Sequence, residues 1–153
     1  MVSHPPPLAK QIVFTAKAMR EAFEEALTSA GGSLGTWVVL SALRDVGCVS
    51  QTALASHVHL EGATITHHID RLETAGLVRR LVDPVDRRVR RLELTEPGEA
   101  LQARLLEAVI ALERQVMTGV TRAERELIEK ALARIQANLA SVAERLPEHA
   151  PAR

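Results

Sequence analysis

Arginine side chains gather in one short stretch of this chain. Between Leu77 and Thr95 six arginines accompany only three acids, Asp83, Asp86 and Glu93, whereas the whole 153-residue chain has 19 basic and 19 acidic residues and no net charge. A guanidinium donates hydrogen bonds from a planar fork that fits phosphate, and arginine also enters narrow minor grooves of duplex DNA. The sequence therefore concentrates here a positive surface that the overall charge lacks. The six residues are Arg79, Arg80, Arg87, Arg88, Arg90 and Arg91.

A second set of polar side chains shares one face of a predicted helix over residues 62–74. Ile65, Ile69 and Leu72 recur at helical spacing and predict the buried side of that helix. Such a helix can present short or hydrogen-bonding side chains to base edges in a DNA major groove, although an ordinary solvated surface has the same composition. The side chains on the opposite face are Ala63, Thr64, His67, Asp70 and Arg71, with His68 on a flank.

Other chemistries find little support in the sequence. Cys48 is the single cysteine, so neither an internal disulfide nor a CxxC motif can form, and we interpret it as a small buried apolar group. Neither His57-x-His59 nor the adjacent pair His67-His68 has the i, i+4 spacing of a helical zinc site. The glycine-rich run after the first predicted helix lacks the lysine of a phosphate loop. We expect no catalytic residue, no metal, no cofactor and no enzyme activity.

The elements that must position these side chains follow a regular order. Apolar periodicity and stop signals predict helices over residues 8–30, 35–45, 51–58, 62–74, 95–119 and 121–146, and a hairpin of strands over 77–82 and 89–94. Ser50 is the expected N-cap of the third helix, and Thr121-x-x-Glu124 is a capping box. Short helices followed by a two-stranded hairpin predict a mainly α fold with a small β-hairpin wing, the winged helix-turn-helix.

The long apolar stripes at both ends predict the domain organisation. The length fits a single domain over residues 1–153, with residues 35–95 as the winged lobe. The helices over 8–30 and 120–146, with part of 96–119, carry more apolar surface than this lobe can bury, so we expect N- and C-terminal dimerisation helices and a homodimer. No apolar run reaches the roughly 18 residues of a membrane span, and no secretory signal is visible. We expect a cytoplasmic chain without a membrane partner.

Two motifs in the winged lobe resemble those of the multiple antibiotic resistance regulator (MarR) family. Residues 83–88, DPVDRR, followed by residues 92–98, LELTEPG, are similar to the signature DPxDRRxxxLxLTxxG of that family. The stretch 72–80 and the pair Leu54-Ala55 also resemble family sequences, so the motif resemblance covers roughly residues 50–98, and the order of helices matches over the whole chain.

The resemblance implies a transcription regulator, usually a repressor, that binds a palindromic operator in double-stranded DNA as a homodimer. It implies that Arg88 enters the minor groove, held by a salt bridge from Asp86, and that Arg87 and Arg90 contact phosphates. Arg80 would brace the wing or reach a phosphate. The further DNA-contacting residues expected on the helices are Ser50, Thr52, Ala63, Thr64, Thr66, His67, His68 and Arg71.

The same resemblance raises the question of a ligand. Many members of the family release DNA when a small aromatic or phenolic anion binds between the dimer helices and the DNA-binding lobe. Here such a pocket would be lined by Met19, Phe23, Trp37, Leu40, Leu105 and Val109, residues that equally fit a plain core and dimer seam. The alternative function is a helical dimeric protein–protein interaction module whose winged helix is not used for DNA. Such a module has no need for six arginines in its wing.

Overall fold

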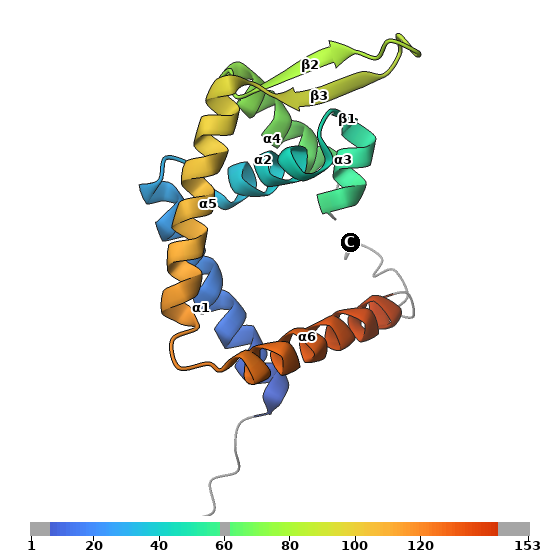
Figure 1. Cartoon of the computed structure of the whole chain (residues 1–153). Coiled ribbons are helices and arrows are strands. Elements are labelled where there is room, and N and C mark those ends of the chain that lie inside the picture. The colour runs from blue at the N-terminus through green and yellow to red at the C-terminus, as the bar shows by residue number, and fades with distance from the viewer. Residues whose placement is uncertain (1–6, 59–61, 144–153) are drawn as a thin grey trace, which may run out of the picture. The chain divides into compact units, whose positions relative to one another are not determined.

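The computed structural model describes residues 7–58 and 62–143 of the chain (Figure 1). Its elements are α1 (Leu8–Ser29), α2 (Leu34–Val46), β1 (Val49–Ser50), α3 (Gln51–Val58), α4 (Gly62–Thr74), β2 (Val78–Val82), β3 (Arg90–Leu94), α5 (Glu96–Val116) and α6 (Arg122–Ala143). The chain divides into two compact units, residues 1–115 and 116–153. The mainly helical content with one small sheet confirms the predicted fold class.

The second helix begins and ends at residues that the sequence marks. The side-chain oxygen of Ser33 accepts a hydrogen bond from the backbone N–H of Thr36 at 3.2 Å and so caps the start of α2. Gly47 follows the last turn of α2 with a φ of 71°, a left-handed conformation that favours glycine. Local sequence signals therefore set both ends of this helix.

Helices α3 and α4 form the helix-turn-helix pair. Ser50 Oγ accepts a hydrogen bond from the backbone N–H of Ala53 at 3.2 Å, which confirms Ser50 as the cap of α3. On α4 the predicted inner face is correct, because Ile65 and Ile69 are fully buried and Leu72 is nearly so. The side-chain amide of Gln51 donates to the hydroxyl oxygen of Thr66 at 2.7 Å, which joins the first turn of α3 to α4.

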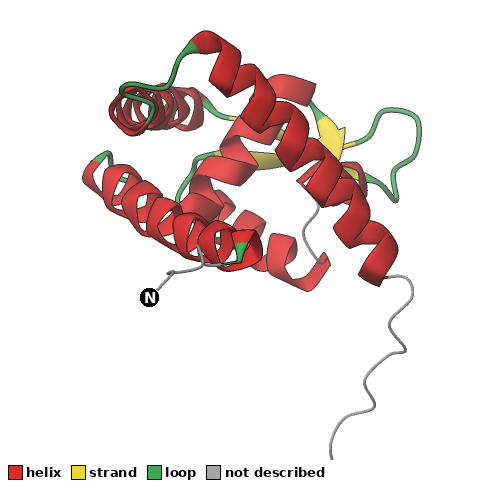
Figure 2. Ribbon diagram, turned by 90° about the horizontal axis from the view of Figure 1, so that it is seen from below, coloured by secondary structure: helices red, strands yellow, loops and turns green. Residues whose placement is uncertain are grey.

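The sheet has three strands rather than the two that the sequence predicts. Its order is β1-β3-β2, with both neighbouring pairs antiparallel. The third strand, β1, is only two residues long and pairs Val49 with Leu92 of β3. No alternating pattern can develop over two residues, so this strand exists because of its distant partner. The loop between β2 and β3 projects from the helices as the wing (Figures 1 and 2).

A hydroxyl and a glycine join the wing to α5. Thr95 Oγ1 donates to the carbonyl oxygen of Gly76 at 2.6 Å and accepts from the backbone N–H of Gly98 at 3.2 Å. The backbone N–H of Thr95 also donates to the carbonyl oxygen of Leu77 at 3.1 Å. The LTxxG part of the wing motif therefore ties the end of β3 to the end of α4.

The core of the first unit draws on every helix that surrounds the sheet. Leu40 of α2, Leu54 of α3 and Leu105 of α5 are all fully buried. They belong to one cluster of buried apolar side chains that also includes Leu27, Val39, Ala42, Leu43, Ile65, Ile69, Leu72, Val78, Leu92 and Leu101. This shared core fixes α4 and the base of the wing to the same support.

The last two helices differ slightly from their predicted ranges. Helix α5 ends at Val116, three residues before Gly119, which has a φ of 83°. In the second unit the predicted capping box is confirmed, because Thr121 Oγ1 accepts from the N–H of Glu124 and Glu124 Oε2 accepts from the N–H of Thr121, at 3.3 and 2.8 Å. Helix α6 is described to residue 143, so the predicted end at residue 146 lies outside the described residues.

In residues 7–58 and 62–143, no helix is by itself long and apolar enough to cross a bilayer. The bent pair α1 and α2 passes the same length and composition test when the two are taken together.

Candidate nucleic-acid interface

The wing turn is built by one carboxylate. Asp83 Oδ1 accepts hydrogen bonds from the backbone N–H groups of Val85 and Asp86, at 2.8 and 3.0 Å. Its other oxygen lies 3.5 Å from a guanidinium nitrogen of Arg91. The hydrogen bond from Asp86, then that from Val85, and then the charge of Arg91 lower the pKa of Asp83 below its ordinary value. The aspartate that opens the wing motif therefore shapes the turn.

The second aspartate of the wing holds Arg88 through the backbone. Asp86 Oδ1 accepts from the backbone N–H of Arg88 at 2.9 Å. The structure has no ion pair between these two side chains, so it does not show the salt bridge that the family resemblance implies. The reason is geometric, since a carboxylate two residues upstream reaches the local N–H group more easily than the end of an extended arginine.

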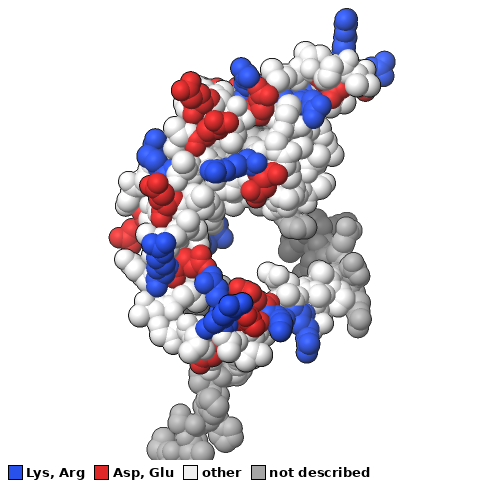
Figure 3. All heavy atoms as spheres, in the orientation of Figure 1, with Lys and Arg blue, Asp and Glu red and all other residues white. Residues whose placement is uncertain are grey.

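The six arginines of the wing region separate into two groups. Arg79 pairs with Glu93, Arg80 with Asp70 and Glu73, and Arg91 with Asp83. The other three have no acidic partner among the described residues, and all are exposed at or next to the wing turn: Arg87, Arg88 and Arg90. Basic side chains accordingly stand at the outer end of the wing in Figure 3. The uncompensated positive charge lies where the wing projects furthest.

Arg80 connects the wing to α4. One guanidinium nitrogen lies 2.5 Å from Asp70 Oδ1 and another contacts Glu73 Oε2, while only 23% of the side chain is exposed. The hydrogen bond to Asp70, with the nearby charge of Glu73, raises the pKa of Arg80 despite partial burial. Of the two roles expected for Arg80, this geometry corresponds to bracing. Sequence reasoning assigned no role to Glu73, although two acids at i, i+3 beside a strand arginine are a usable signal.

The residues expected to read bases are not all on the outer face of α4. His67 and Arg71 are exposed, as that role requires. His68 is half-buried and packs against Gly35 of α2, where an added Cβ would lie 2.2 Å from the imidazole ring. Thr66 is half-buried and bonded to Gln51. The packing of α4 on α2 and α3, which a single helix pattern does not show, turns these two side chains inward.

The remaining predicted contacts are placed by α3 or lie outside the described side chains. Thr52 is exposed on the first turn of α3, and Ser50 is half-buried as the cap of that helix. The side chains of Ala63 and Thr64 are not among those that the structure describes, so both remain sequence predictions.

The predicted ligand-pocket residues are placed mainly in the core. Leu40 and Leu105 are fully buried, and Phe23, Trp37 and Val109 are partly buried against them. None of these, nor Met19, lines the two cavities that α2 borders, which measure about 630 and 140 Å³. The pocket role of these side chains stays a sequence prediction. Among the described residues no group of three or more His, Cys, Asp or Glu side chains could hold a metal ion.

Part of the chain matches the model of a known protein family. Residues 33–89, which contain α2 to the wing turn, match the family model described as "MarR family". The regulator PecS of Dickeya dadantii, an HTH-type transcriptional regulator, is 30% identical over 104 residues, which cover 66% of this chain and 63% of that protein. The chain therefore spans less than two thirds of the length of this curated relative.

Solved structures share the fold over most of the chain. The transcriptional repressor CouR, solved with a 23-mer DNA duplex, is 25% identical with a TM-score of 0.79, covering 85% of this chain and 92% of that one. BpsR of Bordetella bronchiseptica, whose DNA binding is regulated by 6-hydroxynicotinic acid, is 24% identical with a TM-score of 0.78, covering 86% and 94%. Together with the wing motif and the helix-turn-helix geometry, these matches show that residues 33–89 are similar to the MarR family and that the fold of the solved regulators extends over most of the chain.

Proposed function

We propose that this chain is a transcription regulator that binds a palindromic operator as a homodimer. The proposed effect is repression of a neighbouring gene. Residues 35–95 form the DNA-binding lobe of this proposal. The dimerisation helices are residues 8–30 and 120–146 with part of 96–119. DNA binding by the relative CouR supports the proposal, as does the regulator PecS.

One observation carries the proposal: of the six arginines between Leu77 and Thr95, three pair with acids and three have no acidic partner among the described residues. Arg79, Arg80 and Arg91 are neutralised by acids of the same lobe, and thereby stiffen the wing. Arg87, Arg88 and Arg90, at or next to the wing turn, have no acidic partner among the described residues of a chain whose net charge is zero. A folded protein gains nothing from this arrangement by itself, whereas a phosphate backbone would pair with all three. The proposed roles are groove insertion for Arg88 and phosphate contact for Arg87 and Arg90.

The proposed sequence reader is the outer face of α4. His67 can donate a hydrogen bond to a base edge or accept one from it. Arg71 can donate two parallel hydrogen bonds to guanine or to a phosphate. Both side chains are exposed and lie on the helix that Arg80 joins to the wing. Binding by the wing would therefore bring this face to the major groove in a fixed orientation.

Exposed apolar residues support the proposed homodimer. Val13 and Phe14 of α1 are 66% and 60% exposed, and Leu127 and Leu139 of α6 are 66% and 61% exposed. Side chains of this kind normally pack against a partner, and two-fold symmetry would repeat the DNA-binding lobe for two half-sites. A small aromatic or phenolic ligand that releases DNA also belongs to the proposal. Of its proposed lining residues, Leu40 and Leu105 are fully buried within one chain.

The test is salt-dependent binding to the DNA upstream of the chain's own gene, measured by fluorescence anisotropy. Log affinity should fall linearly with log salt, with a slope of about −0.9 for each neutralised phosphate. Arg87→Ala and Arg90→Ala should each make the slope shallower by about 0.9. Arg104→Ala, an exposed change on α5, is the matched control and should leave it unchanged. Absent or salt-independent binding would exclude this function and favour a protein–protein interaction module.

A further inference from the structure

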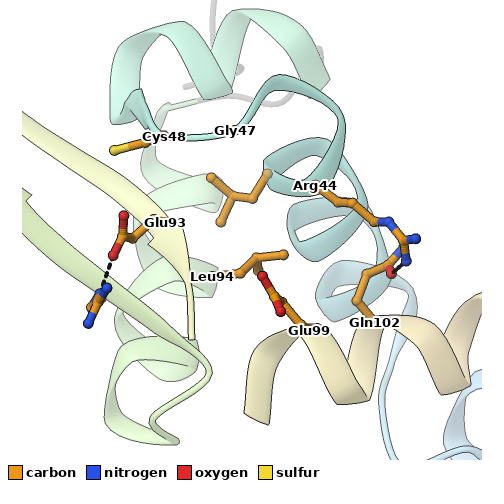
Figure 4. Close-up of a pocket in the computed structure, with 9 residues that line it drawn as sticks. Arg44, Gly47, Cys48, Glu93, Leu94, Glu99 and Gln102 are labelled. Atoms are coloured by element: carbon orange, nitrogen blue, oxygen red, sulfur yellow. Dashed lines mark hydrogen bonds and ion pairs between the residues drawn. The ribbon is translucent and has the colours of Figure 1, made fainter. Parts of the chain in front are cut away.

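A polar cavity lies at the base of the wing, away from the proposed DNA-reading face of α4. It has a volume of about 630 Å³, within the range of about 300–1,000 Å³ that small-molecule sites occupy. The walls come from the end of α2, the loop before β1, strands β2 and β3, and the first turns of α5 (Figure 4). The side chains of Leu43 and Leu94 supply its apolar surface.

A cation is held in place on one side of this cavity. A guanidinium nitrogen of Arg44 donates to Oε1 of Gln102, a contact that links α2 to α5 (Figure 4). Gln102 is only 3% exposed, so its buried amide holds the guanidinium firmly. The amide is neutral, and Arg44 has no acidic partner among the described residues. Gln102 uses one of the five N–H donors of this exposed guanidinium, and the other four have no hydrogen-bond partner among the described residues.

A single uncompensated anion also lines the cavity. Of the two carboxylates there, Glu93 is already paired with Arg79. Glu99 is exposed on the first turn of α5, and its carboxylate has neither a hydrogen bond nor an ion pair in the part of the chain that the structure describes. The cavity therefore offers one positive group, one negative group and an apolar surface.

We propose that this cavity binds a small amphoteric molecule whose apolar body carries one anionic and one cationic group. A free α-amino acid with an apolar side chain is the simplest example. The carboxylate would pair with Arg44, the ammonium group with Glu99, and the side chain would cover Leu43 and Leu94. Because Leu94 and Glu93 belong to β3, an occupant would touch the wing directly. Any effect on DNA rests on the proposed function, but the binding itself does not.

The test uses the full chain without DNA, so that its result is independent of the proposed function. L-phenylalanine is titrated by calorimetry beside 3-phenylpropionate, which lacks the ammonium group, and 2-phenylethylamine, which lacks the carboxylate. Each analogue should bind at least roughly tenfold more weakly, since each loses one charge-assisted contact. Equal binding of either analogue would overturn the amphoteric class, and no binding of L-phenylalanine at millimolar concentration would overturn the site.

Two variants locate the site. Arg44→Met and Glu99→Gln should each weaken L-phenylalanine binding by roughly tenfold or more. Arg104→Met and Glu107→Gln, exposed changes on α5 outside the cavity, are the matched controls and should leave it unchanged. The Glu99 carboxylate has no partner in residues 7–58 and 62–143, so Glu99→Gln should keep the melting temperature even if Arg44→Met does not. Unchanged affinity in Glu99→Gln would place binding elsewhere and contradict the proposal.

Discussion

Gly98 packs directly against the backbone of Leu77. A Cβ added to Gly98 would lie 2.0 Å from the carbonyl oxygen of Leu77, and that oxygen also accepts the N–H of Thr95. The contact joins the first turn of α5 to the start of the wing. Its partner is backbone, which cannot rotate away as a side chain can. The glycine of the LTxxG motif is therefore required by the close approach of two main chains.

Gly98→Ala should destabilise the protein, although alanine is the better helix former. Propensity alone favours alanine by about 1 kcal/mol, whereas the clash should cost about 1–3 kcal/mol or more, so the net change is a loss. Chemical denaturation measures the free energy of unfolding. Ala100→Gly, at an exposed site on the same helix, calibrates the propensity effect. A stabilised Gly98→Ala variant would contradict the close contact.

Arg80→Met should loosen the wing without removing a phosphate contact. The loss of two ion pairs at a partly buried arginine should cost about 1–2 kcal/mol, since an exposed pair contributes up to about 1 kcal/mol. Operator affinity should fall while the salt slope stays unchanged. Arg79→Met, which breaks a more exposed pair, should cost less. A slope shallower by about 0.9 would instead make Arg80 a phosphate ligand.

Arg88→Ala and His67→Ala should affect DNA binding in different ways. Arg88→Ala should weaken binding to operator and to random duplexes alike, and reduce any preference for narrow minor grooves. His67→Ala should lower discrimination against mutated operators by about 1–3 kcal/mol. Competition binding with both kinds of DNA measures the two effects. Equal effects of both variants on all sequences would refute this division of roles.

His68→Ala should act on stability rather than on sequence preference. Its imidazole fills the space beside Gly35, so truncation leaves a cavity between α4 and α2 and should lower the free energy of unfolding by about 1–2 kcal/mol. The ratio of operator to random-DNA affinity should change much less than in His67→Ala. If a stably folded variant showed a much smaller ratio of operator to random-DNA affinity, His68 would instead be a base-contacting residue.

The wing turn should be sensitive to acid through Asp83. Its folded-state pKa is lowered, so the carboxylate stabilises the turn above the ordinary value of 3.8 and this contribution is lost as pH falls through the lowered pKa. NMR should show the amide signals of Val85 and Asp86 moving together below that ordinary value. Asp83→Asn should abolish the movement. A transition above the ordinary value would show that the carboxylate is not bonded as described.

The sequence by itself determined the local elements of this protein. Ser33, Ser50 and Thr121 cap their helices through atoms only a few residues away. The inner face of α4 follows from helical spacing, and the wing from two β-rich runs around turn residues. Interactions of such short range depend little on the rest of the chain, and the family signature lies within them.

Only the tertiary structure decided which polar groups remain available. It pairs Arg80 with Asp70 and Glu73, turns His68 toward Gly35, and adds strand β1 through its pairing with β3. It also brings Arg44 beside Gln102, 58 positions further along the chain. Each of these contacts depends on how separate elements pack, and the charge of a side chain does not reveal its partner. The six arginines carry the same charge in the sequence, and packing leaves Arg87, Arg88 and Arg90 without an acidic partner among the described residues.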